Sequence, residues 1–181
     1  VFTHISCFGL DDGAVQNILI VGGTSPFEFT VDGGPPGYPP FTGLDLGLHT
    51  IEVVDANNCE NSDIIIVNEP TLFEVETTVS DWNNYQIRCN GDNSGYVDIQ
   101  AWGGTAPYVT DSTSFWNSIN IDSISAGIDT FIVQDANGCE YQEIIVFNEP
   151  SPIQHNFIAT HVSCVAWNNG AVTDSVYGGV G

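Results

Sequence analysis

Cysteine is the residue type in this sequence with the clearest capacity for covalent chemistry. The five cysteines are Cys7, Cys59, Cys89, Cys139 and Cys164. Structural metal sites use closely spaced pairs such as Cys-x-x-Cys, and the sequence contains none. The spacing therefore favours disulfide bonds, which form and persist in oxidising compartments. We expect an extracellular or cell-surface protein.

The cysteines belong to motifs that recur along the chain in one order. A hexapeptide that ends at Cys7 recurs with its end at Cys164, and a more diverged version ends at Cys89. Three other motifs recur 80 or 81 residues apart, at 22–27 and 103–108, at 55–59 and 135–139, and at 68–70 and 148–150. Ordered recurrence at one spacing indicates tandem repeats. We expect three copies, at 1–70, 71–150 and 151–181, of which the third is truncated.

The repeat pattern suggests how the cysteines pair. We expect one disulfide inside each complete copy, Cys7 with Cys59 and Cys89 with Cys139, and a partner for Cys164 beyond residue 181. Each bond would close a loop of about 50 residues and contribute roughly 4 kcal/mol by chain-entropy reasoning. An odd cysteine can also be a reactive thiol or form an intermolecular bridge, and both alternatives stay open for Cys164.

The elements that must position these cysteines are short β-strands. Residues 96–101 alternate apolar and polar side chains, and the β-branched runs 64–67 and 144–147 precede a proline. Alternation of period two is typical of half-buried strands, and turn signals such as Asp12-Gly13 separate them. The pattern predicts an all-β protein of tandem immunoglobulin-like sandwiches, about 75–80 residues each. One extra residue before the first Gly-Gly pair predicts a β-bulge within 14–21.

The charge of the chain excludes several classes of partner. One basic residue stands against 23 acidic residues, which gives a net charge of -22. Binding to nucleic acid or anionic lipid requires Lys and Arg, so we expect neither. No apolar run approaches the roughly 18 residues of a membrane span, so we expect no membrane insertion. Divalent cations or salt would then balance the carboxylates.

Calcium is the only cofactor that the sequence suggests, and it does so weakly. The acidic turns contain Asp11 with Asp12, and Asp92 with Asn93. Calcium takes six to eight oxygen ligands, but neither turn matches the spaced EF-hand loop. A solvated turn is the simpler interpretation, and we expect no other cofactor or metal. Glu69 and Glu149 could bridge neighbouring copies through an ion or simply end a strand.

The full set of motifs resembles the SprB repeat. The set comprises a Cys, then Asn/Asp-Gly, then Gly-Gly-Thr-x-Pro-aromatic, then Asp-Ala-Asn-x-Cys, then a closing Pro. SprB repeats occur in very large surface adhesins of gliding bacteria, which the type IX route exports. The resemblance thus implies an extracellular adhesin or filament. Two positions differ from the family pattern, because His49 and Asp129 stand where an aromatic residue is usual.

The resemblance also draws attention to three serines that follow an aspartate. In the same bacterial group, Asp-Ser/Thr-aliphatic tripeptides carry O-linked glycans. Similar tripeptides place candidate O-glycosylation sites at Ser112, Ser123 and Ser175.

A proline-rich insert in the first copy is a candidate contact loop. Residues 33–41 contain four prolines beside Tyr38 and Phe41. Prolines stiffen a loop, so its exposed aromatic rings lose little entropy on binding. The alternative is a rigid loop that covers a sheet edge or docks on the next copy.

These observations favour a structural or adhesive function. No G-x-S-x-G, H-E-x-x-H or P-loop motif is present, so we expect no enzyme. We expect a repeat segment of a long extracellular filament or cell-surface adhesin, linked through the resemblance to gliding motility. Its partners would be neighbouring repeats of the same chain and surface polysaccharide or other surfaces. The alternative is a carbohydrate-binding or spacer module of a secreted multidomain protein.

Overall fold

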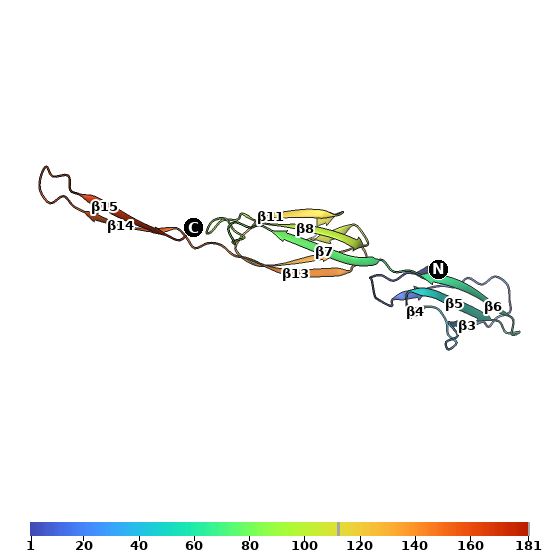
Figure 1. Cartoon of the computed structure of the whole chain (residues 1–181). Coiled ribbons are helices and arrows are strands. Elements are labelled where there is room, and N and C mark those ends of the chain that lie inside the picture. The colour runs from blue at the N-terminus through green and yellow to red at the C-terminus, as the bar shows by residue number, and fades with distance from the viewer. Residues whose placement is uncertain (112, 181) are drawn as a thin grey trace. The chain divides into compact units, whose positions relative to one another are not determined.

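The computed structural model describes residues 1–111 and 113–180, whose regular elements are all β-strands (Figure 1). The strands are β1 (Phe2–Thr3), β2 (Gly13–Val15), β3 (Glu28–Val31), β4 (Phe41–Leu44), β5 (Gly47–Val54), β6 (Glu60–Val67), β7 (Thr71–Val79), β8 (Gly95–Gly104), β9 (Tyr108–Thr110), β10 (Thr113–Phe115), β11 (Ser118–Ile124), β12 (Gly127–Gln134), β13 (Glu140–Phe147), β14 (Gln154–Thr160) and β15 (Ala171–Tyr177). Within this described part, no helix is long and apolar enough to cross a membrane. The prediction of an all-β fold is confirmed.

The chain forms two compact units that do not follow the expected copies residue by residue. Unit 1 contains Val1–Val75, Ala101–Asn117 and Ile132–Tyr141. Unit 2 contains Glu76–Gln100, Ser118–Phe131 and the C-terminal residues from Gln142. The boundaries expected at residues 70 and 150, and the tandem immunoglobulin-like organisation, stay predictions.

The first copy is a small sandwich-like arrangement of two three-stranded sheets. One sheet has the order β1-β2-β4 and the other the order β3-β5-β6. Strands β5 and β6 pair antiparallel over their full length, from Gly47 opposite Val67 to Val54 opposite Glu60. A buried cluster of Ile5, Val15, Leu44 and Val67 forms the core. Val15 and Val67 are almost completely buried.

The second copy also contains two sheets, in the orders β11-β8-β7 and β10-β9-β12-β13. In unit 1, Tyr108 lies between Phe73 and Phe115, with ring centroids 5.6 and 5.7 Å away. In unit 2, Phe131 and Phe147 make an edge contact with their centroids 6.5 Å apart. Aromatic pairs at such distances add to the stability that burial of their area provides.

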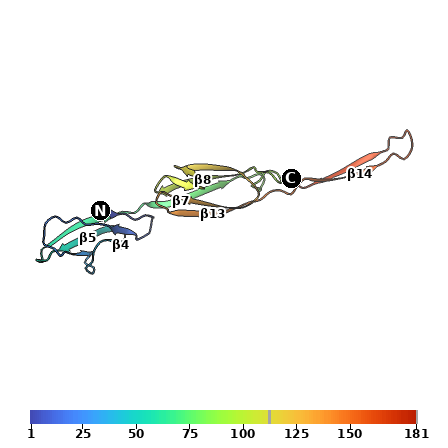
Figure 2. The same ribbon diagram turned by 180° about the vertical axis from the view of Figure 1, so that it is seen from behind.

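The third copy is a single hairpin in which β14 pairs with β15, as both views show (Figure 2). The pairing runs without interruption from Gln154 opposite Tyr177 to Thr160 opposite Ala171. Every residue of both strands is exposed. By its position in the repeat, the hairpin corresponds to β7 and β8 of the second copy. Its exposed strands have no packed layer over them.

The strand after the first turn glycine differs between the copies. In the second copy β8 is continuous from Gly95 to Gly104, whereas in the first copy β2 ends at Val15. The register between β2 and β4 shifts at Gly13 and Ala14, where Gly43 of β4 is the extra residue. The bulge expected within 14–21 is therefore not observed, because the strand ends at Val15 and residues 16–21 lie outside the ladder. The bulge at Gly43 is a different feature, on the partner strand.

The Gly-Gly pairs of the later copies allow the chain to cross itself closely. A Cβ atom on Gly103 would lie 1.8 Å from the carbonyl oxygen of Leu72, and one on Gly178 would lie 2.1 Å from that of Pro152. Gly22, the counterpart in the first copy, has open space around it. Leu72 and Pro152, near the start of each copy, lie directly against the backbone of the Gly-Gly pair and leave no room for a side chain. Glycine is therefore required at Gly103 and Gly178.

His49 fills the position where the family pattern has an aromatic residue. It is 4% exposed. Its Nδ1 lies 2.7 Å from Asp32 Oδ2, and its Nε2 lies 2.9 Å from the carbonyl oxygen of Asp45. Asp32 also accepts the Thr50 backbone N–H at 2.7 Å. The buried imidazole is thus bonded through both of its ring nitrogens.

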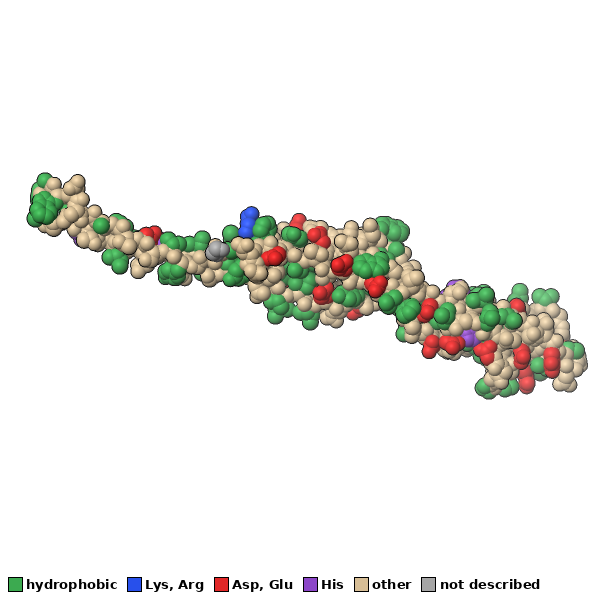
Figure 3. Space-filling view, in the orientation of Figure 1, with side chains coloured by type: hydrophobic (Ala, Val, Ile, Leu, Met, Phe, Trp, Pro, Cys, Tyr) green, Lys and Arg blue, Asp and Glu red, His purple; other side chains and the backbone are tan. Residues whose placement is uncertain are grey.

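Acidic side chains are spread over the visible face of the chain, beside many apolar ones (Figure 3). The described residues contain three ion pairs, and all involve histidine, namely His49 with Asp32, His49 with Asp45, and His155 with Asp174. Other carboxylates, such as Asp12 and Asp135, accept hydrogen bonds from N–H and O–H donors.

Candidate functional site

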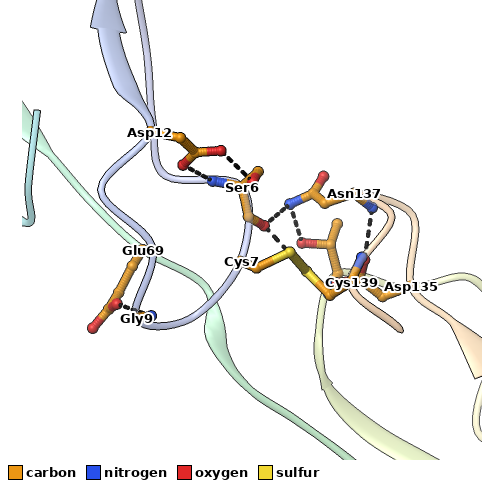
Figure 4. Close-up of a disulfide and its surroundings, with 9 residues drawn as sticks. Ser6, Cys7, Gly9, Asp12, Glu69, Asp135, Asn137 and Cys139 are labelled. Atoms are coloured by element: carbon orange, nitrogen blue, oxygen red, sulfur yellow. Dashed lines mark hydrogen bonds between the residues drawn. A yellow bond between two sulfur atoms is a disulfide. The ribbon is translucent and has the colours of Figure 1, made fainter. Parts of the chain in front are cut away.

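The segment around Cys7 forms a tight loop that we call the Cys turn. The Leu10 N–H donates to the carbonyl oxygen of Cys7 at 3.1 Å. Asp12 closes the loop by accepting the Ser6 backbone N–H at 2.9 Å and the Ser6 hydroxyl. The N–H of Gly9 donates to Glu69 Oε2 at 2.9 Å, which anchors the loop to the end of β6. Figure 4 shows Cys7 on one side of this loop and Gly9 further along it.

The segment 135–139 between β12 and β13 forms a second structure, which we call the Asp turn. One carboxylate organises it, because Asp135 Oδ1 accepts the N–H groups of Asn137 and Cys139 at 2.9 and 2.8 Å. Its Oδ2 accepts the Thr105 N–H at 2.8 Å. Asp135 is 4% exposed. Aspartate commonly forms such side-chain turns to its own following backbone.

A disulfide joins the Cys turn of the first copy to the Asp turn of the second. Cys7 and Cys139 are bonded, with their Cα atoms 5.7 Å apart and a sequence separation of 132 residues. Asn137 Nδ2 donates to the Ser6 carbonyl oxygen at 2.9 Å and to Thr105 Oγ1 at 3.0 Å (Figure 4). The covalent bond and the amide contact lie side by side, so they hold the two turns in one geometry.

The expected pairings of Cys7 with Cys59 and of Cys89 with Cys139 are wrong. The Cys turn lies at one end of β6, because the Ile5 N–H donates to the Asn68 carbonyl oxygen at 3.0 Å. Cys59 precedes the other end of the same strand. Eight residues of extended strand span roughly 25 Å, whereas a disulfide needs Cα atoms within about 7 Å. Cys59 and Cys89 are exposed free thiols instead, as is Cys164.

Two of the turn carboxylates titrate abnormally. Hydrogen bonds from the Ser6 hydroxyl and backbone N–H lower the pKa of Asp12 below its usual value. Backbone N–H donors of Cys59 and Thr24 lower the pKa of Asp55, the counterpart of Asp135 in the first copy. Each carboxylate is therefore stabilised in its ionised form by donors that hold the turn closed.

Of the residues suggested for calcium, Asp12 closes the Cys turn and Asp92 lies in the equivalent loop at Cys89, the second Cys turn. Asp12 accepts from Ser6, and Asp92 accepts the N–H of Asn93 at 2.7 Å. Asp11 is exposed. Over residues 1–111 and 113–180, no group of three or more His, Cys, Asp and Glu side chains could hold a metal ion.

Glu69 and Glu149 each accept a backbone N–H of a Cys turn, from Gly9 and Gly91 respectively. Sequence reasoning missed this anchoring role.

The candidate glycosylation sites differ in setting. Ser123 is exposed in β11 at the register shift between Ile121 and Ile124, and its hydroxyl donates to Asp122 at 3.0 Å. Ser175 is exposed in β15. Ser112 lies outside the described residues. Both described hydroxyls are accessible, and glycan occupancy stays a prediction.

The proline-rich insert separates its two aromatic residues. Tyr38 is 69% exposed, with its ring 6.2 Å from that of Phe29 in an edge contact. Phe41 begins β4 and packs against the core cluster. Of the predicted contact pair, only Tyr38 presents its ring to solvent.

Together these features define an all-β, sandwich-like protein in which the Cys turn at Cys7 is cross-linked to the Asp turn at Cys139. Residues 85–109 match the family described as the SprB repeat. This match confirms the resemblance over the segment from the second Cys turn to β9. SprB repeats are associated with cell-surface and extracellular proteins. No curated protein and no solved structure matches the chain significantly.

Proposed function

We propose that this chain is a structural and adhesive segment of a long extracellular filament or cell-surface adhesin. The match to the SprB repeat supports a surface protein. The recurrence of the same motifs about 80 residues apart supports an array. A role in gliding motility belongs to this proposal, since the resemblance links SprB repeats to gliding adhesins.

The observation that carries the proposal is the bond between Cys7 and Cys139. It connects the first copy to the Asp turn of the second, 132 residues away. A pulling force that enters before Cys7 and leaves after Cys139 passes through the disulfide and not through the residues between them. The strands of both copies are thereby protected from unravelling along that stretch. Such protection is useful to a protein that bears load outside the cell.

The charge and the exposed ring suit the same function. A net charge of -22 keeps chains apart in solution. Tyr38 on the proline-rich insert gives each chain one weak aromatic contact site for polysaccharide or another surface. Weak sites repeated along an array act together through effective concentration. Adhesion would then arise from many contacts and not from one deep pocket.

Single-molecule force spectroscopy tests the load-bearing part of this proposal. The chain is pulled from its two ends, first oxidised and then in a reductant such as dithiothreitol. We expect reduction to lengthen the fully extended chain by about 460 Å, because 132 residues become extensible at about 3.5 Å each. The variant Cys139→Ser should show the long contour without reductant. Equal contours of the oxidised and reduced chains would contradict the proposal.

A further inference from the structure

The Cys turn occurs in all three copies with the same hydrogen bonds. The N–H three residues after each cysteine donates to its carbonyl oxygen at 3.1 Å, in Leu10 to Cys7, Asp92 to Cys89 and Trp167 to Cys164. The N–H before each cysteine donates to a side chain six residues further on, in Ser6 to Asp12, Arg88 to Ser94 and Ser163 to Asn169. Cys89 and Cys164 therefore occupy the geometry of a cysteine that is cross-linked in the first copy.

The Asp turn occurs twice with equally close agreement. Asp55 Oδ1 accepts the N–H groups of Asn57 and Cys59 at 2.8 and 2.9 Å, as Asp135 does from Asn137 and Cys139. The amide of Asn57 donates to Thr24 Oγ1 at 2.9 Å, as that of Asn137 does to Thr105. The turn at Cys59 is thus complete before any partner is present, and only the bond to a Cys turn is missing.

A groove beside Cys89 marks where such a partner fits. It is lined by Arg88, Cys89, Asn90, residues 150–153, Gly179 and Val180. In sequence, Gly179 and Val180 correspond to Gly104 and Thr105. Thr105 supports the Asp turn of the second copy, because its N–H donates to Asp135 and its carbonyl oxygen accepts the Ala136 N–H at 2.7 Å. One side of the groove is thus a Cys turn. The other side is Gly179 and Val180, whose counterparts in the second copy support an Asp turn.

We infer that every Cys turn of the array is cross-linked to the Asp turn of the repeat that follows it. Cys89 forms a disulfide with the Asp-turn cysteine of the repeat that begins with β14, and that Asp turn packs on Gly179 and Val180. Cys59 forms a disulfide with the Cys-turn cysteine of a repeat on its N-terminal side. Successive disulfides then overlap along the chain, so each repeat is covalently tied to both neighbours. This inference goes beyond the proposed function and holds whether or not the chain is adhesive.

Each link forms by a balanced exchange. The two thiols lose two protons and two electrons as the S–S bond forms. A thiol–disulfide oxidoreductase of the oxidising compartment accepts them, and its own disulfide is reduced to a dithiol through a mixed-disulfide intermediate. The exposed thiols of Cys59 and Cys89 are accessible to such an enzyme.

The 181-residue chain gives the first test. The chain is oxidised by dissolved oxygen, and its remaining thiols are blocked with iodoacetamide. It is then digested without reduction by Glu-C and Asp-N proteases, because trypsin has a single basic residue at which to cleave. We expect three blocked thiols, at Cys59, Cys89 and Cys164, and one cross-linked peptide pair, Cys7 with Cys139. The control Cys7→Ser should leave all four remaining cysteines blocked. A bond between Cys89 and Cys139, in either chain, overturns the inference.

The native protein that contains this segment gives the second test. It is isolated with its thiols blocked before lysis and mapped in the same way. We expect Cys89 to be bonded to an Asp-turn cysteine C-terminal to it, and Cys59 to a Cys-turn cysteine N-terminal to it. A free Cys89, or bonds within single copies, would overturn the inference. If Cys89 is free while Cys7 remains bonded to Cys139, the inference fails and the proposed load-bearing function survives.

Discussion

The side-chain amide of Asn137 donates to the carbonyl oxygen of Ser6 at 2.9 Å, directly beside the disulfide between Cys7 and Cys139. The two turns are therefore held by a hydrogen bond as well as by a covalent bond. Because the amide contact does not depend on oxidation, we expect it to form in the reduced chain as well. Several expectations about stability derive from this arrangement.

Removal of the disulfide should destabilise the chain strongly. A loop of 132 residues corresponds to about 5 kcal/mol of denatured-state entropy. We expect Cys139→Ser to lower the free energy of unfolding of the oxidised chain by up to about that amount. Urea unfolding followed by tryptophan fluorescence measures the change. The matched control is Cys59→Ser, which removes a free thiol and should leave the unfolding midpoint unchanged. Equal losses in both variants would show that the cross-link is not formed.

The contact between Asn137 and Ser6 can be isolated by comparing the two Asp turns. Asn137→Ala removes donors to Ser6 and Thr105, whereas Asn57→Ala removes a donor to Thr24 alone. We expect Asn137→Ala to cost about 1 kcal/mol more than Asn57→Ala, the usual net value of one hydrogen bond. Urea unfolding under reducing conditions measures the difference without the disulfide. Identical losses would show that the amide contributes nothing to joining the turns.

The two Gly-Gly pairs should respond differently to alanine. Gly22 and Gly103 both have positive φ, at 91° and 71°, so both variants incur about 1–2 kcal/mol of backbone strain. Gly103→Ala also places a Cβ atom 1.8 Å from the Leu72 carbonyl oxygen, so we expect a loss beyond about 4 kcal/mol. Thermal unfolding by circular dichroism compares the two variants. A Gly103→Ala chain as stable as Gly22→Ala would contradict the close crossing.

Stability should depend on pH through His49 and Asp32. Burial acts to lower the pKa of His49, but the bonds to Asp32 and Asp45 outweigh it and raise that pKa above the ordinary 6.5. This contribution is complete below pH 6.5 and is lost as the pH rises through the raised pKa. The bond from His49 lowers the pKa of Asp32 below 3.8, so its contribution is lost only as the pH falls through the lowered value.

The excess stability of the parent chain over His49→Gln should therefore be greatest between about pH 3.8 and pH 6.5. Unfolding midpoints measured from pH 3 to pH 9 give this difference. Asp129→Asn is the matched control, because Asp129 stands at the corresponding position of the second copy and is exposed. A constant difference across the pH range would show that the pair does not titrate as a unit.

Two substitutions in the proline-rich insert should affect different properties, one the binding of the chain and the other its stability. Tyr38 is 69% exposed, so Tyr38→Ala should change the free energy of unfolding by less than about 0.5 kcal/mol. Phe41→Ala opens the core cluster and should cost about 2 kcal/mol or more. We expect Tyr38→Ala to weaken retention of the chain on immobilised bacterial surface polysaccharide. Unchanged retention of this variant would remove Tyr38 from the proposed contact site.

Much of this protein could be predicted from its residues alone. Alternation of apolar and polar side chains over 96–101 identified β8, and the runs at 64–67 and 144–147 identified β6 and β13. These predictions succeeded because strand propensity and side-chain alternation are local properties. The repeat of Asp-Ala-Asn-x-Cys likewise marked both Asp turns, because an aspartate bonds to the backbone that immediately follows it.

The partner of each cysteine was decided only by the tertiary structure. The sequence placed Cys59 and Cys139 at similar distances along the chain from a preceding cysteine, so pairing within a copy satisfied the spacing. The folded β6 keeps Cys59 at the opposite end of a strand from the Cys turn, and the Asp turn of the next copy brings Cys139 to Cys7 instead. A disulfide requires proximity in space, and antiparallel strands separate neighbours in sequence while joining residues that are far apart along the chain.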